Sequence, residues 1–328
     1  MGEKKAKKYA VFFLKTGLAI LAIWYLFKSG RLTEESLIRL FKAKNLPFFI
    51  LSAVFFFLSQ ILCSIRLILL LKMINLPLRI VQGFKLTMIG NFFNMVIPGT
   101  VGGDIIKALY LFKNEEDSRG RSSGIIVMDR VLGLLALFLL AGISIIYLAQ
   151  RYKGILSSYH NELYIILISI AVVLSLFMGL FFFGRNERIR QKLKNVIFTL
   201  FRKGIFYHMA EGFGAISKNR QLLIHSLLIS ILVQLFSLTG LLILLNLIRN
   251  AFSEFISLAA VSSIVMLLGV VPVTPGNIGW TELIAAVGWS AVGSNTGAEI
   301  FFYWRVVIIF CSLIGAFLYY TPLKIKSS

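Results

Sequence analysis

The stretch GNFFNMVIPGTVGGDIIKALYLFK, residues 90–113, is largely apolar, but a proline, three glycines and an aspartate interrupt its middle. Proline and glycine disfavour a continuous helix, and an aspartate is costly in lipid. A second stretch, PVTPGNIGWTE at 272–282, repeats the pattern Pro-Gly-x-[Val/Ile]-Gly and also places an acid shortly after it. We therefore predict two re-entrant helical hairpins, 86–112 and 257–292, each broken at its Pro-Gly pattern.

The composition is that of an integral membrane protein, with 58% hydrophobic residues, 29 Phe and a mean hydropathy of +0.86. Several apolar runs reach the roughly 20 residues that a helix needs to cross a bilayer. The alternation of a β-barrel is absent, so the predicted fold class is all-α and polytopic. The first run follows KKAKK, is long and has no signal-peptide cleavage site, which favours a retained helix. The predicted full spans are 9–27, 48–71, 123–149, 161–183, 222–248 and 299–320.

The sequence lacks the motifs of several other functions. Cys63 and Cys311 both lie in apolar runs, and the three histidines have no metal-ligand spacing. No phosphate-binding loop, serine-hydrolase motif or zinc-protease motif is present. We therefore expect no metal, no cofactor and no ATP-driven motor.

A formal charge of +20 invites a nucleic-acid interpretation, but Lys and Arg also hold loops on the cytoplasmic side of a membrane. With a cytoplasmic N-terminus, the predicted spans place 21 basic residues inside and 8 outside. This bias predicts a multi-pass protein of the prokaryotic cytoplasmic (inner) membrane, with an external loop at 150–160 and a cytoplasmic tail at 321–328. The basic connector 184–221 interleaves its charges with apolar residues, which favours contact with anionic lipid headgroups over nucleic acid.

The predicted elements occur in the same order twice. Residues 1–149 contain span, span, hairpin and span, and residues 161–320 contain the same series. Three crossings per half is an odd number, so the second half enters from the opposite side, as in transporters with inverted-topology repeats. The spacing agrees, because Pro98 precedes Arg130 by 32 positions and Pro275 precedes Arg305 by 30.

Broken backbone is tolerated inside the membrane only where protein buries it or where it lines a watery cavity. The two breaks therefore predict a shared polar cavity, towards which the half-helices direct free N–H groups that attract an anion. Asn91 and Asn94, one helical turn apart, either face this cavity or satisfy the broken backbone. The residues predicted to form the breaks are Pro98, Gly99, Gly102, Gly103, Pro275, Gly276 and Gly279.

Charged residues inside the spans are the other candidates, because each is costly near the bilayer centre unless it is paired or hydrated. Arg66 and Arg305 lie towards the ends of their spans and could instead reach the headgroup region. Asp129 and Arg130 are adjacent and point about 100° apart on a helix, so each needs a different partner. Asp104 either caps its helix or contacts a ligand or proton. The predicted cavity network is Arg66, Asp104, Asp129, Arg130, Glu282 and Arg305.

These stretches, together with DRVLGLL at 129–135, resemble the lysylphosphatidylglycerol synthase transmembrane family, the flippase-like module of bifunctional aminoacyl-phosphatidylglycerol synthases. The resemblance covers nearly the whole chain and includes the basic residue Lys107, three positions after Asp104. Asn277 departs from the glycine that the family often has there. The resemblance implies transport of a phospholipid with a polar or aminoacylated headgroup. It also implies a standalone member without the soluble aminoacyltransferase domain, so a separate enzyme would modify the lipid.

The expected mechanism is that the arginines contact the lipid phosphate, while Asp104, Asp129 and Glu282 contact a cationic amine or a coupling proton. Two alternatives remain open: a membrane-embedded lipid-modifying transferase of the synthase type, and a scaffold that transports nothing. Lipid analysis of deletion cells separates the three. A lost lipid species indicates the enzyme, a changed leaflet distribution the flippase, and neither the scaffold.

Overall fold

The computed structural model confirms the all-helical class. The structure describes residues 17, 20–40, 42–96, 102–112, 119–152, 220–248 and 255–321. Outside these residues lie the predicted span 161–183, most of the predicted span 9–27 and most of the connector 184–221. The count of six spans therefore stays a prediction.

Among these described residues, four helices are long and apolar enough to cross a membrane. Each agrees with a predicted span to within about one helical turn at either end. These helices are α3 (Leu46–Lys72), α6 (Arg119–Arg151), α11 (Arg220–Ile243, continued by the 3-10 turn η4, Leu244–Leu247) and α14 (Gly297–Tyr319).

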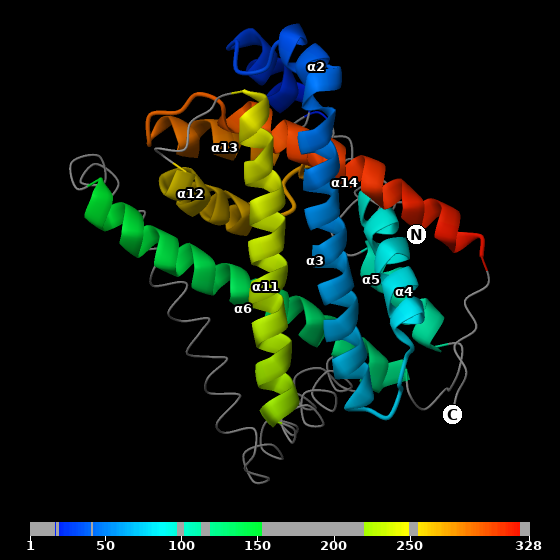
Figure 1. The fold of residues 1–328 in the computed structure, drawn as a ribbon. Helices are drawn as coiled ribbons and strands as arrows, with labels where there is room; N and C mark the ends of the chain where they lie inside the picture. Colours follow the sequence, from blue (N-terminus) through cyan, green and yellow to red (C-terminus); the bar gives the residue numbers. More distant parts are fainter. Residues whose placement is uncertain are drawn as a thin grey trace, which may run out of the picture.

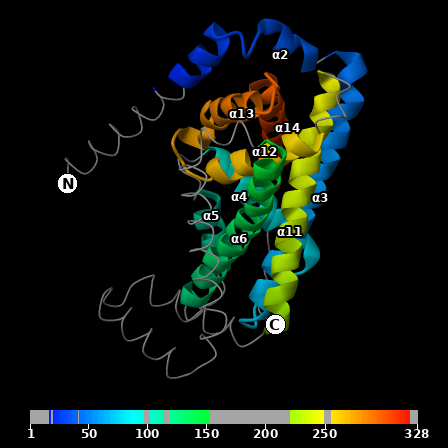
Figure 2. The same cartoon turned by 90° about the vertical axis from the view of Figure 1, so that its left-hand side faces the viewer.

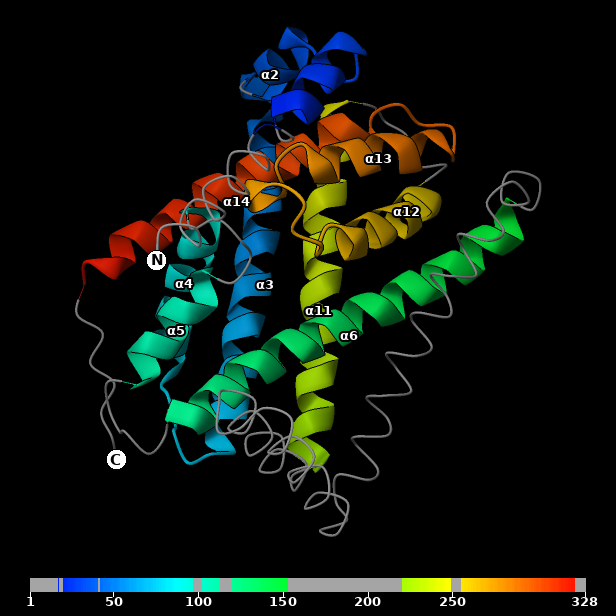
Figure 3. The ribbon, with the colours of Figure 1, turned by 180° about the vertical axis from the view of Figure 1, so that it is seen from behind.

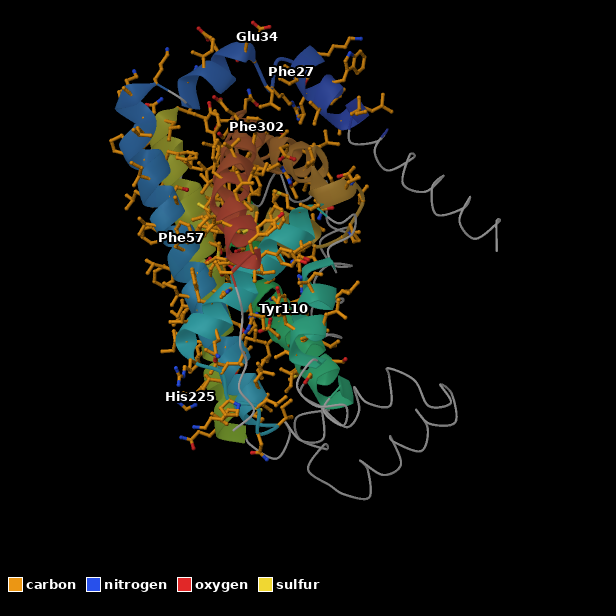
Figure 4. All side chains as sticks on the ribbon, turned by 90° about the vertical axis from the view of Figure 1, so that its right-hand side faces the viewer. Phe27, Glu34, Phe57, Tyr110, His225 and Phe302 are labelled. Atoms are coloured by element: carbon orange, nitrogen blue, oxygen red, sulfur yellow. The ribbon has the colours of Figure 1, made fainter. Side chains whose placement is uncertain are left out.

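Helices α3 and α11 pack side by side and run in opposite directions (Figure 1). They form one layer of the molecule, and the other described helices lie on one side of it (Figure 2). Seen from behind, α6 and α14 cross this layer obliquely (Figure 3). Glu34 and His225 lie at opposite ends of the bundle, and the apolar Phe57 lies between them (Figure 4).

The apolar side chains on the outside of the layer have helical spacing. On α3, Ile50, Val54, Leu58 and Ile61 are all exposed. Residues spaced three and four apart lie on one face of a helix, so these side chains form a stripe that suits contact with lipid.

The first hairpin consists of α4 (Ile80–Val96) and α5 (Gly102–Phe112). It begins earlier than the predicted residue 86. The reason is local, because the Gln82 side chain accepts a hydrogen bond of 2.8 Å from the Arg79 N–H. This is one half of a capping box, and it fixes the first turn at Ile80.

The second hairpin consists of α12 (Phe255–Leu268) and α13 (Trp280–Ser290), with the short 3-10 turn η5 (Pro275–Asn277) between them. The two hairpins pack in a reciprocal way. In the first hairpin, α4 packs against α14 and α5 packs against α6. In the second hairpin, α12 packs against α6 and α13 packs against α14. Both hairpins therefore lie between α6 and α14.

A short N-terminal region covers one end of this arrangement. It contains helical residues 20–28, α2 (Glu34–Leu40) and the 3-10 turn η1 (Ala43–Asn45). Leu26 and Leu32 are buried against Ala286 and Ala298, which belong to α13 and α14. An ion pair also links α2 to α14 at this end, because the Arg39 guanidinium lies 3.6 Å from the Glu299 carboxylate.

Two close helix crossings that involve the first hairpin depend on glycine. A Cβ atom at Gly315 of α14 would overlap the Met88 carbonyl oxygen of α4, and one at Gly103 of α5 would overlap the Gly90 carbonyl oxygen. Small residues allow such close approach of helices in membranes. Backbone atoms therefore hold α4, α5 and α14 together directly.

We expect Gly315→Ala to lower the free energy of unfolding by about 1–3 kcal/mol, because the added methyl meets backbone that cannot rotate away. Thermal unfolding followed by size-exclusion chromatography in detergent measures this. Gly17→Ala is the control, because that helical glycine has open space around it and alanine is the better helix former. Equal unfolding midpoints for the two variants would contradict the close crossing.

Candidate functional site

The break in the second hairpin is built from residues with left-handed backbone. Gly276, Asn277 and Gly279 have φ values of 60°, 55° and 79°. Asparagine tolerates this conformation better than other residues with a side chain. Its side-chain Nδ2 also donates to the Gly269 carbonyl. Asn277 therefore maintains the turn at a position where the family often has glycine.

Arg305 of α14 holds this break together. Its guanidinium donates to the carbonyl oxygens of Gly276, at 2.7 Å, and Asn277, at 2.8 Å. It also donates to the carboxylate of Glu282, the third residue of α13. The Glu282 side chain is only 2% exposed. Arg305 thus supplies hydrogen-bond donors to the carbonyl oxygens at the break.

The predicted break residues Pro98 and Gly99 lie outside the described residues, whereas Gly102 and Gly103 belong to the first turn of α5. The Asn94 side-chain oxygen accepts a hydrogen bond of 2.8 Å from the Gly103 N–H. This contact caps the first turn of α5 from α4. Asp104 follows directly, and it forms an ion pair of 2.7 Å with Arg130 of α6.

Arg66 is buried within the protein. Its Nε atom lies 2.7 Å from an Asp129 carboxylate oxygen, and its Nη1 donates to Ser230 Oγ at 2.9 Å. Arg66 therefore joins α3, α6 and α11. Asp129 and Arg130 turn to different partners, in agreement with their predicted directions.

Lys107 completes a group that we call the buried charge cluster: Arg66, Asp104, Lys107, Asp129 and Arg130. Lys107 is only 7% exposed, and its side-chain methylenes lie against Gly90. It is close enough to Asp129 to interact electrostatically. However, its ammonium makes no hydrogen bond or ion pair anywhere in the described part of the chain. With three basic and two acidic side chains, the cluster carries one excess positive charge.

A cavity of about 410 Å³ lies between the last turns of α4 and the break of the second hairpin. Helices from both halves of the chain line it, and α4 contacts η5 beside it. Phe56, Phe301 and Trp304 supply much of its apolar wall. Its polar side chains are Gln60, Asn91, Asn94, Gln234, Asn277, Thr281, Arg305 and Ser312.

The predicted network is thus divided between two places. Arg305, Asn91, Asn94 and Gly276 line the cavity, whereas the buried charge cluster is not part of its lining. All three predicted acids, Asp104, Asp129 and Glu282, are paired with arginine.

Sequence reasoning overlooked Gln60 and Gln234. Both are amides in the middle of apolar spans, and each is the fifteenth residue of its helix, α3 or α11. Polar side chains within a span are a functional signal in membrane proteins. That signal was present in FFLSQILCS and ILVQLFSL.

No three His, Cys, Asp or Glu side chains come together as a metal site within the described ranges. The geometry instead provides hydrogen-bonding amides, hydroxyls and a nearby excess of positive charge. These groups are able to bind and orient a polar group, and among the described residues of the lining no nucleophile is hydrogen-bonded to a base.

Comparison with known proteins agrees with this membrane architecture. The family described as the lysylphosphatidylglycerol synthase TM region matches residues 12–315. The chain is also similar to the UPF0104 membrane protein PH1989 of Pyrococcus horikoshii, with 22% identity over 311 residues that cover 88% of each chain. No solved structure matches the chain.

We expect Arg305→Ala to lower the free energy of unfolding by about 3–5 kcal/mol, because it leaves the buried Glu282 carboxylate without its cation. Arg130→Ala is the matched comparison. Its side chain is 43% exposed, so its loss should change stability by about 1 kcal/mol or less. Unfolding by SDS in mixed micelles measures both. Similar losses for the two variants would show that Arg305 does not support the break.

Proposed function

Because the chain belongs to the family of the lysylphosphatidylglycerol synthase TM region, we propose that it moves a phospholipid between the two leaflets of the membrane. The lipid headgroup passes through the cavity between the hairpins, while the acyl chains stay in lipid. The single observation that carries this proposal is the buried charge cluster, in which the Lys107 ammonium has no hydrogen bond or ion pair among the described residues.

An unpaired cation buried in a membrane protein is strongly unfavourable. A stable protein keeps such a group when an anion occupies the site during function. A lipid phosphate is the anion available at this depth. Lys107 and the half-exposed Arg130 are the two cations that it would contact. Arg130 is paired with Asp104 but remains accessible, whereas Arg66 and Arg305 are much less exposed and each bonds to several protein groups.

The inverted repeat is part of the proposal. Four features support it: the opposite directions of α3 and α11, the reciprocal packing of the hairpins, and the ion pairs Asp104–Arg130 and Glu282–Arg305. Each acid is the third residue of the second helix of its hairpin. Two halves that are related in this way around a central site can change the side from which the site is open.

The orientation in the membrane follows from charge. We infer that both termini are cytoplasmic, that the membrane is the prokaryotic inner membrane, and that the connector 184–221 contacts anionic headgroups, because basic residues concentrate on that side. A separate enzyme that modifies the lipid is a further partner consistent with the family.

We expect Lys107→Met to reduce lipid movement at least tenfold and, in the same protein, to raise thermal stability. The physical reason is that the substitution removes the phosphate partner and also the penalty of burying an unpaired charge. Purified protein in phosphatidylcholine vesicles with acyl-chain NBD-labelled phosphatidylglycerol measures transport, because dithionite bleaches only the outer leaflet.

Lys85→Met is the matched control. Lys85 is equally buried, but its ammonium donates to the Thr321 carbonyl at 2.7 Å. Its removal should leave lipid movement unchanged and should lower stability, since the carbonyl loses a partner. Wild-type transport by Lys107→Met would refute the phosphate site.

A further inference from the structure

The hydrogen-bonding groups of the cavity identify the kind of headgroup that it accepts. We infer that the cavity binds a neutral, hydroxyl-rich group, so that the transported phospholipid carries a polyol such as glycerol or a sugar. This inference rests on the proposed function, and it concerns the chemistry of the same site.

Several amide groups in the cavity lining have one end bonded and one end free. Asn91 donates to Gln60 Oε1 at 2.6 Å, and its own Oδ1 has no donor among the described residues. Asn94 accepts from Gly103 through Oδ1, and its Nδ2 has no acceptor in the described part of the chain. Gln234 makes one long bond of 3.5 Å through Nε2 to the Gly133 carbonyl, and its Oε1 has no described donor.

Two further lining residues contain buried polar atoms without any partner in the described structure. These atoms are Asn277 Oδ1 and Ser312 Oγ, and both residues are at least nine-tenths buried. Native proteins leave few such atoms unpaired, and the exceptions are commonly filled by water or ligand. The residues that line the cavity therefore include acceptors and a donor whose partners are not among the described residues, and two of these atoms, Asn277 Oδ1 and Ser312 Oγ, are closed to solvent in this conformation.

This mixture matches one chemical class of ligand. A hydroxyl group both donates and accepts, whereas an ammonium only donates and a phosphate only accepts. An ammonium would leave the Asn94 Nδ2 unpaired, and a phosphate would leave the amide oxygens unpaired. The volume of about 410 Å³ falls in the range of small-molecule sites, about 300–1,000 Å³.

The charge of the cavity also favours a neutral headgroup. Arg305 lines it, but this cation is neutralised by Glu282. The described residues that line the cavity include no carboxylate to meet a cationic amine. The nearby acids Asp104, Asp129 and Glu282 all bond to arginine. A cationic aminoacyl headgroup would thus enter without a counter-ion.

The cavity and the buried charge cluster adjoin at the first hairpin. Asn94 lines the cavity, and its side chain bonds to Gly103, the residue before Asp104. Lys107 lies one helical turn further along α5. A phosphate at the cluster would accordingly place the alcohol esterified to it in or near the cavity.

The direct test compares three acyl-chain NBD-labelled lipids in the vesicle assay: phosphatidylglycerol, phosphatidic acid and lysyl-phosphatidylglycerol. We expect wild-type protein to move phosphatidylglycerol at least tenfold faster than the other two. Equal rates for all three, or faster movement of the lysyl lipid, would overturn the inference while the proposed function stands. Movement of none would overturn the proposed function itself.

Two substitutions sharpen the test. Ser312→Ala should slow the movement of phosphatidylglycerol several-fold without loss of stability. Ser122→Ala removes an equally buried and unpartnered hydroxyl outside the cavity, and it should leave this rate unchanged.

Gln234→Glu adds a negative charge at constant shape, so it should shift the lipid preference of the protein from phosphatidylglycerol towards the lysyl lipid. The exposed Gln221→Glu on the same helix is its control. An unchanged preference in Gln234→Glu would contradict the assignment of the cavity.

Discussion

A peptide carbonyl inside lipid needs a hydrogen-bond donor, and this requirement determines how both hairpins are built. An intact helix satisfies it internally, but a break exposes carbonyls and N–H groups at the point where the chain turns. Arg305 supplies the donors for Gly276 and Asn277, and Asn94 supplies an acceptor for Gly103. The cavity is located where these side chains converge, so its position follows from the need to satisfy the broken backbone.

The two acid–arginine pairs have different surroundings and therefore different consequences. Glu282 is almost fully buried, and Arg305 is bonded to the backbone around it. Arg130 is 43% exposed and lies in a cluster with an excess positive charge. A buried pair mainly fixes geometry, whereas an exposed cation next to an unpaired lysine can still exchange partners with an incoming anion. Similar sequence patterns thus support a rigid element in one half and an adaptable one in the other.

The sequence predicted the helical class and the four described spans well, because about 20 consecutive apolar residues have few alternatives in a membrane. It also predicted that Asp129 and Arg130 need separate partners, since neighbours on a helix diverge. It could not identify those partners, because Arg66 and Ser230 come from distant segments. It also could not predict the role of Asn277 or of the cavity amides that are bonded at one end only. Those roles depend on backbone angles and side-chain directions, which no linear pattern encodes.

Backbone contact at glycine also has a mechanical consequence. Because α4 meets α5 at Gly90 and Gly103, and α14 at Met88 and Gly315, no intervening side chain can rotate to let these helices slide. They form one stiff block. The contact of α6 with α12 includes the hydroxyl pair Ser144 and Ser263, at 2.7 Å, whose hydrogen bond can be exchanged for others. Any opening of the cavity during the proposed transport would therefore have to occur at exchangeable contacts of this kind, between the stiff parts of the structure.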